Sequence, residues 1–262
     1  MRSGIGSLAA VLLVVAALAA LPGLALGQEF LSYPQFRYTG GLPGNGFGVT
    51  ADGTAGFKGA MSQCIPLGYT PGHGSYAFAL NDGTIKGHDG ICIGTGEGAN
   101  GNFFAAYGFN IGKHAICPSY DAVDGDLNPA YNLQVQVANE TKTRPGISVG
   151  VLDIMNWRES TRGVPPGDAG ARSFYAAATK RFGADKHPVY ATVGVGSNRF
   201  RGGFGGLSYD VTRRVKVLAE YDAFAFNAGV AADLTGGKRN SVVLFMGAAS
   251  LNRPVVGLSV AH

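Results

Sequence analysis

The sequence has few charged residues and, beyond residue 26, no long hydrophobic run. Charged residues make up 15% of the 262 residues. No later apolar stretch approaches the ~20 residues that a transmembrane helix needs, which excludes a helical membrane protein for the rest of the chain. Glycine is abundant, at 42 residues, but follows no Gly-X-Y period, so collagen is also excluded. Because Val, Ile, Phe and Tyr recur throughout in alternating positions, we do not expect a disordered chain.

Cysteine is scarce as well, and Cys64, Cys92 and Cys117 are the complete set. Their spacing matches no zinc-binding pattern, and the histidines show no i, i+4 pair. We therefore expect no metal and no cofactor. An odd number of cysteines leaves at least one thiol unpaired within the chain, and the sequence does not select a disulfide pair. Nucleic-acid binding is not expected either, since the net charge is only +4 and no long basic run occurs.

The first feature that is present is an export signal. Arg2 precedes an almost unbroken apolar stretch over residues 8–21, and Pro22 and Gly23 then break the pattern before small residues. We predict a signal peptide over residues 1–27, with the mature chain starting near Gln28. An uncleaved membrane anchor is the alternative, but the Pro-Gly break favours cleavage. No linker or change of composition divides the remainder, which predicts one domain over residues 28–262.

The clearest strand pattern lies in residues 214–223, where apolar and charged side chains alternate. Successive side chains of a strand point to opposite faces, and ten residues are the length of a tilted strand that crosses a bilayer. One face carries Val215, Val217 and Tyr221, and the other carries Lys216, Glu220 and Asp222. We predict that the first face contacts lipid and that the second lines the lumen of an outer-membrane β-barrel.

About fourteen segments of the mature chain have a strand-like pattern, among them residues 46–51, 55–64 and 90–95. Bacterial single-chain barrels close on an even number of strands. The expected fold is an all-β, antiparallel, transmembrane-type β-barrel of about 12 strands, with 10 to 14 as the range. A soluble, exported all-β protein that binds a ligand is the alternative, because periodicity alone does not distinguish lipid from a protein core.

The predicted connections are of unequal length. Tight turns are expected at residues 52–53, 212–213 and 223–224, and long polar loops at residues 66–74, 114–130 and 157–170. Short turns at one end and long loops at the other are typical of outer-membrane barrels.

Charged and polar residues on the strands give two candidate sites. If Lys216, Glu220 and Asp222 face the lumen, neighbouring strands must supply partners, because buried charges persist only when paired or hydrated. The candidate lumen partners are Arg181, Gln136 and Asp233. A candidate basic rim near the strand ends consists of Arg199, Arg201, Arg213 and Arg214. Such a rim could bind lipid phosphate or an acidic polysaccharide, or be merely solvated.

Two motifs suggest enzymes, and both fit strands better. Residues 146–150 match the G-x-S-x-G nucleophile elbow around Ser148, but the following residues continue a strand where the elbow needs a helix. Residues 96–101 match G-x-G-x-x-G, again without a helix to bind a pyrophosphate. We expect no enzymatic activity, with a Ser148-dependent hydrolase as a less favoured reading.

Four short segments follow one another in the second half of the chain. They are Thr192-Val-Gly-Val-Gly-Ser-Asn-Arg-Phe200, Gly203-Phe-Gly-Gly-Leu-Ser-Tyr209, Leu218-Ala-Glu-Tyr-Asp222 and Asn227-Ala-Gly229. In this order they resemble segments of the YjbH-type outer-membrane proteins. In that family a Gly-rich strand ending in Arg-Phe, a Phe-Gly-Gly hairpin and a Glu-Tyr-Asp strand followed by Asn-x-Gly recur in this order. The match covers roughly residues 188–230. It implies a bacterial outer-membrane β-barrel linked to exopolysaccharide production and implies no catalytic residues.

Together these features predict an outer-membrane protein with a structural or envelope role, in the setting of surface polysaccharide export. The expected partners are the lipid bilayer and polysaccharide or export-machinery proteins.

Overall fold

The computed structural model describes residues 33–37, 41–84, 99–123, 127–156, 170–236 and 240–262. The predicted signal peptide therefore lies outside the described residues, as do the strand candidate at 90–95 and most of the loop at 157–170. Within the described ranges the only helices are two single 3₁₀ turns, η1 (Pro34–Phe36) and η3 (Asn198–Phe200). No helix in the described part of the chain is long and apolar enough to cross a membrane.

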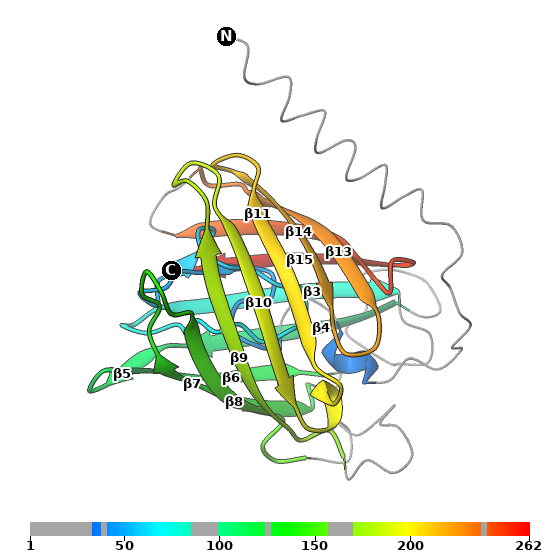
Figure 1. Ribbon diagram of the computed structural model, residues 1–262. Coiled ribbons are helices and arrows are strands. Elements are labelled where there is room, and N and C mark those ends of the chain that lie inside the picture. Colours follow the sequence, from blue (N-terminus) through cyan, green and yellow to red (C-terminus); the bar gives the residue numbers. More distant parts are fainter. Residues whose placement is uncertain (1–32, 38–40, 85–98, 124–126, 157–169, 237–239) are drawn as a thin grey trace. The chain divides into compact units, whose positions relative to one another are not determined.

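The wall is a closed ring of twelve antiparallel strands (Figure 1). They are β3 (Tyr76–Thr84), β4 (Ala99–Tyr107), β6 (His114–Ala122), β7 (Pro129–Ala138), β8 (Gly146–Leu152), β9 (Ser173–Phe182), β10 (Val189–Gly196), β11 (Phe204–Asp210), β12 (Val215–Tyr221), β13 (Phe226–Asp233), β14 (Ser241–Ala249) and β15 (Arg253–Ala261). The last strand, β15, pairs with the first, β3, which closes the ring. The prediction of an all-β, antiparallel barrel of about 12 strands is confirmed.

One short strand continues another. β5 (Phe109–Ile111) follows β4 after Gly108, and both pair with β6. Tyr107 and Gly108, which are not paired with β6, lie opposite Pro118 and Cys117 on that strand, between the pairs Ala106–Ser119 and Phe109–Ile116. Proline has no N–H to donate to a ladder, so it is tolerated where the neighbouring strand is broken.

β6 is the wall strand that the sequence did not predict, since residues 114–130 were expected to form a long loop. The segment contains Pro118 and Asp121, residue types that are common in turns. In the structure its side chains instead alternate between the inner and outer faces of a strand. Its inward side chains are Cys117, Ser119 and Asp121, all buried. An alternation between small polar and half-exposed residues carries a weak hydrophobic signal, which explains the error.

Two predicted strands are not part of the wall. Residues 46–51 and 55–64 contain only β1 (Gly48–Val49) and β2 (Ala55–Gly56), which pair with each other in a separate two-stranded sheet. Residues 66–74, predicted as a long polar loop, are mostly buried.

The strand connections define two ends of the barrel. At one end, which we call the loop end, β3 ends at Thr84 and β8 at Leu152, whereas the C-terminal end carries Ala261 at the end of β15. The turns at 212–213 and 223–224 are tight, with Thr212 N–H bonded to Val215 O and Asp222 N–H to Ala225 O. They lie at opposite ends, because consecutive hairpins of an up-and-down barrel alternate. Short and long connections are thus not separated by end as strictly as the sequence predicted.

Side chains alternate across the wall as expected for a barrel in lipid. On β10, for example, Tyr190 and Thr192 are buried, while Val193 and Val195 are 63% and 65% exposed. On β12, Lys216, Leu218 and Glu220 are buried and Tyr221 is 38% exposed. Polar side chains therefore point inward and apolar ones outward, which is the reverse of a soluble protein.

Candidate functional site

The barrel interior is occupied by the chain that precedes the wall. We call residues 33–37 and 41–75 the inner segment. Most of its residues are buried, and its backbone is bonded to strands far apart around the ring. Phe57 N–H, for example, donates to Ser241 Oγ on β14, and Thr70 N–H to Gln136 Oε1 on β7. The segment starts at the loop end, where Arg37 binds Asp222, and reaches the C-terminal end, where Tyr76 N–H donates to His262 O.

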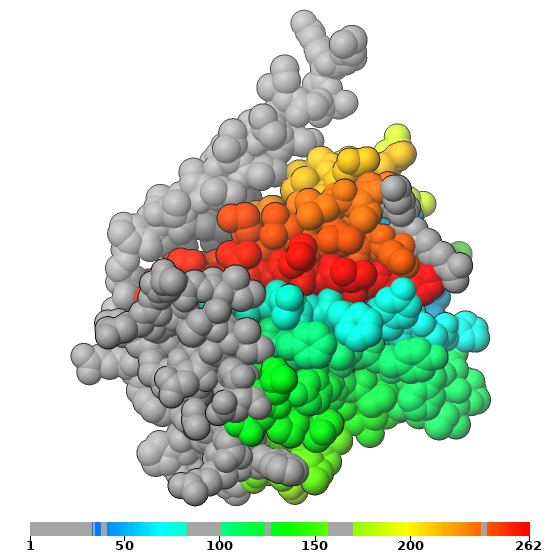
Figure 2. All heavy atoms as spheres, turned by 180° about the vertical axis from the view of Figure 1, so that it is seen from behind, coloured from blue at the N-terminus to red at the C-terminus, as the bar shows by residue number. Residues whose placement is uncertain are grey.

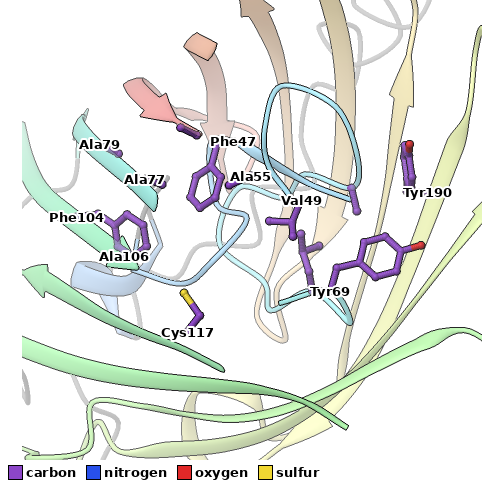
Figure 3. Close-up of a cluster of buried hydrophobic side chains, with 13 residues drawn as sticks. Phe47, Val49, Ala55, Tyr69, Ala77, Ala79, Phe104, Ala106, Cys117 and Tyr190 are labelled. Carbon is purple, nitrogen blue, oxygen red and sulfur yellow. The ribbon is translucent and has the colours of Figure 1, made fainter. Parts of the chain in front are cut away.

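Apolar side chains of the inner segment meet small residues of the wall. Figure 3 shows Phe47, Val49 and Tyr69 of this segment facing the interior side of the strands. The wall residues of the same cluster are Ala77, Ala79, Phe104, Ala106, Cys117, Tyr190 and Ala261, and five of these seven are small. Because the wall contributes mainly small residues, the inner segment supplies the bulk that fills the lumen.

Glycines bring the wall and the inner segment close together. A Cβ on Gly68 would lie 2.3 Å from the backbone N of Thr179 and 2.4 Å from Gly146 O. A Cβ on Gly146 would lie 2.7 Å from the ring of Tyr69. Only glycine fits such approaches without a backbone shift.

Polar wall side chains bind the irregular backbone of the inner segment. Ser208 Oγ accepts from Met61 N–H at 3.2 Å, and Thr179 Oγ1 accepts from Gly68 N–H at 2.7 Å. Gln136 bonds twice, as Oε1 accepts from Thr70 N–H at 2.7 Å and Nε2 donates to Gly68 O at 2.7 Å. Backbone groups without a regular ladder must be satisfied in this way when they are buried.

A buried charge cluster lies at the loop end of the interior. Arg37 Nε donates to Asp222 Oδ2 at 2.8 Å, and Arg199 Nη2 lies 3.4 Å from the same oxygen. Glu220 accepts the backbone N–H of Gln63 at 2.8 Å through Oε2 and that of Cys64 at 2.9 Å through Oε1. The cluster thus joins the inner segment to β12, to the turn after it and to the loop 197–203.

This cluster controls the protonation of two groups outside the strands. Burial raises the pKa of Asp222, but Arg199, Arg37 and the hydrogen bonds from Asn227 and from Ala225 N–H together lower it more, so the net pKa lies below the usual range of a carboxyl. Burial, together with the carboxylates of Glu220 and Asp222, raises the pKa of the Cys64 thiol well above its usual value. Asp222 is therefore ionised and Cys64 is a neutral thiol at neutral pH. Cys64 and Cys117 are both free thiols.

The structure places Lys216, Glu220 and Asp222 on the inner side of the wall. Lys216 Nζ donates to Gly59 O at 2.6 Å and also binds Asp210. Its ammonium group lies over the rings of Phe57 and Tyr190.

The partners of these three residues are not the ones that the sequence suggested. Gln136 binds the inner segment, and Asp233 accepts from Thr235 N–H and Oγ1. Arg181 lies at the end of β9 with its side chain 38% exposed and pairs with exposed Asp185. The partners of the three residues are instead Arg199, groups of the inner segment and, for Lys216, Asp210 opposite it on β11. The Lys216–Asp210 pair joins neighbouring strands, whereas no local pattern in the strands reveals Arg199 or the inner segment.

The basic rim is also different from the prediction. Arg199 is fully buried inside the barrel and pairs with Asp222, because η3 turns its side chain into the interior. Arg201, Arg213 and Arg214 are exposed. Arg201 lies at the loop end, whereas Arg213 and Arg214 lie at the C-terminal end, so the four arginines do not form one patch.

Ser148 is a buried wall residue. Its hydroxyl donates to Leu67 O at 2.5 Å, and β8 continues through Gly150 and Val151 where a nucleophile elbow would turn into a helix. His187, one of the two histidines that follow Ser148 in the chain, approaches the backbone oxygen of Asp210 at the end of β11. The geometry of Ser148 is that of a support for the inner segment.

The interior has little free space where the structure describes it. A hollow beside Glu220, lined by Met61, Ile65 and Thr192, has no room for a water molecule, and neither has a second hollow beside Cys64 and Phe200. Among the described residues, no group of three or more His, Cys, Asp or Glu side chains is placed to hold a metal.

The inner segment is the part of the site that sequence reasoning missed. One signal was available, since residues 59–72 contain no charged residue although they are punctuated by Pro66, Pro71 and several glycines. An exposed loop of this length normally carries charges, so their absence indicates burial.

Comparisons with known proteins give structural similarities only. No protein-family model matches the chain, and no curated protein matches it. A solved structure of the KdgM porin in complex with disordered oligogalacturonate is 9% identical and covers 72% of this chain and 98% of its own, with a TM-score of 0.49. A triple mutant of the Rhodopseudomonas blastica porin is 14% identical and covers 61% of this chain and 54% of its own, with a TM-score of 0.34.

Proposed function

We propose that this chain is a bacterial outer-membrane β-barrel with a structural or envelope role, held closed by its own inner segment. The observation that best supports this proposal is the apolar outer surface of the wall. Large apolar side chains are exposed on most wall strands. They include Phe78, Leu80, Tyr131, Val149, Phe174, Val193, Val195, Leu207, Phe226, Met246, Val256, Leu258 and Val260.

These side chains lie on neighbouring strands and so form a continuous surface rather than scattered positions. Figure 2 shows the outer face formed by β14, β15, β3 and β4, which are consecutive in the ring. Soluble monomers rarely expose apolar patches larger than a few hundred Å², because each Å² left in water costs roughly 25 cal/mol. Lipid is the medium that matches this surface.

The exopolysaccharide role implied by residues 188–230 stays a prediction. A polymer has no path through the interior while the inner segment occupies it. We therefore place any part in polysaccharide export at the level of the envelope, through contacts with export-machinery proteins, rather than in transport through this lumen.

Membrane localisation is tested by fractionation of cells that express the full chain. The proposal expects the mature protein in the detergent-extracted outer membrane and its co-flotation with liposomes after refolding. A monodisperse protein in the soluble periplasm without detergent would support the soluble ligand-binding alternative instead. N-terminal sequencing of the recovered protein tests cleavage near Gln28.

An activity screen with esterase substrates tests the remaining alternative. The hydrolase reading expects turnover that Ser148→Ala abolishes, whereas the proposed function expects no turnover in either protein.

A further inference from the structure

We propose that the inner segment is a displaceable plug and that the wall around it is a hydrophilic channel for small cationic and neutral polar solutes. This inference rests on the proposed membrane location, since only a barrel in a membrane separates two compartments. It goes beyond a structural role, because it assigns a transport activity to a second state of the same chain.

The first argument concerns which part of the chain, the wall or the plug, supplies the large side chains that fill the lumen. Gly206 on β11 faces the side chain of Ile65, and a Cβ there would lie 2.9 Å from Ile65 Cδ1. Gly146 leaves room for Tyr69 in the same way. Small barrels whose interior is permanently solid are filled by inward side chains of the wall itself. This wall instead leaves a space of the width of a chain, which a separate segment occupies.

The second argument is the chemistry of the contacts that would be exposed. Many bonds between wall and plug join a side-chain hydroxyl or amide of the wall to a backbone group of the plug, as Ser259 Oγ does with Gly46 O at 2.9 Å. Ser208, Thr179 and Gln136 act likewise. Water can replace the plug at each of these groups, so the emptied lumen is lined by hydratable side chains. Such a lining is typical of porin channels.

The third argument is charge, which selects the class of solute. Among the residues that the structure describes, the buried charged residues of the wall and its loops are five carboxylates and two cations: Asp121, Asp153, Glu220, Asp222 and Asp233, against Arg199 and Lys216. Arg37, which compensates Asp222, belongs to the plug and leaves with it. The emptied channel therefore has a negative lining, which attracts cations and repels anions.

Arg37 is the contact whose loss should favour opening. Its side chain binds Asp222 through Nε at 2.8 Å and Ser250 Oγ through Nη2 at 3.1 Å, which fixes the plug at the loop end. Arg37→Ala does not leave Asp222 without partners, because Arg199, Asn227 and the backbone N–H of Ala225 remain. The variant should therefore fold while its plug is held less firmly.

A native thiol allows the plug to be locked. Cys64 Sγ in the plug lies 3.4 Å from Asn227 Nδ2 on β13, so Asn227→Cys places a second thiol within reach of a disulfide. We would make this change in a Cys92→Ser background, so that no thiol outside the described residues competes. Oxidation should close the plug and dithiothreitol should release it.

The experiment measures conductance of the refolded full chain in planar bilayers under a KCl gradient, with liposome flotation as a separate assay of insertion. We expect brief, rare openings in the wild type and at least a tenfold rise in open probability in Arg37→Ala. The oxidised lock in the Arg37→Ala background should return the open probability to the wild-type level, and reduction should restore it. The reversal potential should have the sign of a cation-preferring pore. Arg213→Ala, which removes an exposed arginine of a turn, is the matched control and should behave as the wild type.

The possible failures can be told apart. Arg37→Ala protein that floats with liposomes but conducts no more than the wild type would overturn the plug proposal and leave the membrane proposal intact. Openings that the oxidised lock does not suppress would overturn it as well, and an anion-preferring reversal potential would overturn the solute class. If no variant floats, the proposed function fails and the channel fails with it. If Arg37→Ala does not refold, Glu220→Gln takes its place, because it weakens the hydrogen bonds that Glu220 accepts from the backbone N–H groups of Gln63 and Cys64. The same rise in open probability is expected.

Discussion

At the residue scale, Asp222 joins more parts of the molecule than any local pattern suggests. It accepts bonds from Arg37, Asn227 and the backbone N–H of Ala225, and it pairs with Arg199. The sequence predicted an inward-facing carboxylate here but not its partners. Partners from residues 37 and 199 are brought in by the fold, so nothing within ten residues of Asp222 could have revealed them.

We predict that Asp222→Ala lowers the free energy of unfolding by about 3–5 kcal/mol, because it leaves Arg37 and Arg199 buried with no shared carboxylate. Urea unfolding in detergent micelles, followed by circular dichroism, measures the change. Asp185→Ala is the matched control. It breaks an ion pair whose carboxylate is 94% exposed, and it should leave the midpoint nearly unchanged. Equal midpoints for the two variants would contradict the buried cluster.

The Cys64 thiol gives the protein a dependence on alkaline pH. Its pKa is raised in the folded state, so above the unfolded value of about 9 the unfolded thiol ionises and the folded one does not. Stability contributed by the neutral thiol is therefore full below pH 9 and falls as the pH rises further, by up to ~1.4 kcal/mol per pH unit. We predict that the wild type loses more stability between pH 8 and pH 10 than Cys64→Ala does. Parallel urea midpoints for the two proteins over this range would show that the prediction is wrong.

At the element scale, two kinds of strand differ in how well they were predicted. β12 was predicted correctly because charged residues recur on one face, at Lys216 and Glu220, with only Leu218 between them, while the other face carries no charge. β6 was not, because Pro118 and Asp121 suggest a turn when read alone, and only the break between β4 and β5 makes Pro118 acceptable. The candidate strands at 46–51 and 55–64 alternate as well, yet they lie in the interior. An alternating pattern shows that the two faces of a strand lie in different media. It does not show which strands close the ring.

Leu207 tests whether the outer face of the strands contacts lipid. It lies in the middle of β11 with its side chain 56% exposed. We predict that Leu207→Arg lowers the unfolding free energy by about 2–4 kcal/mol in lipid vesicles, because the charge must enter the apolar part of the bilayer. Leu234→Arg is the matched control, at a leucine that is 57% exposed and lies beyond the end of β13, and it should cost little. Equal, small effects at both sites would indicate that water surrounds the barrel.

At the scale of the whole molecule, ring closure depends on the pairing of the last strand with the first. β15 pairs with β14 over nine residue pairs and with β3 over seven. We predict that a chain ending at Asn252 forms no protease-resistant barrel, because both β14 and β3 are left with unpaired edges. Limited proteolysis in detergent measures the outcome, and deletion of His262 alone should preserve the resistant fragment. A resistant core of similar size in the truncated chain would contradict the closed ring.

The interior is where the predicted site and the structure differ most. The sequence suggested lumen charges balanced by Arg181, Gln136 and Asp233, and an exposed rim that included Arg199. In the structure the inner segment fills the lumen, and Arg199 is buried inside the barrel. The sequence did not decide whether the lumen is open or filled, because each strand reports only that its inner face is polar.

By itself the sequence determined the all-β class, the antiparallel wall of about twelve strands and the orientation of segments such as β12. These follow from alternation over a few residues, which depends on local geometry and on the media at the two faces. Only the tertiary structure decided which segments form the wall, that the preceding chain fills the lumen, and that Arg37 and Arg199 meet at Asp222. The reason is that these contacts join residues as many as 213 positions apart, and the inner segment gains its stability from contacts all around the ring. No periodic pattern along the chain encodes such contacts.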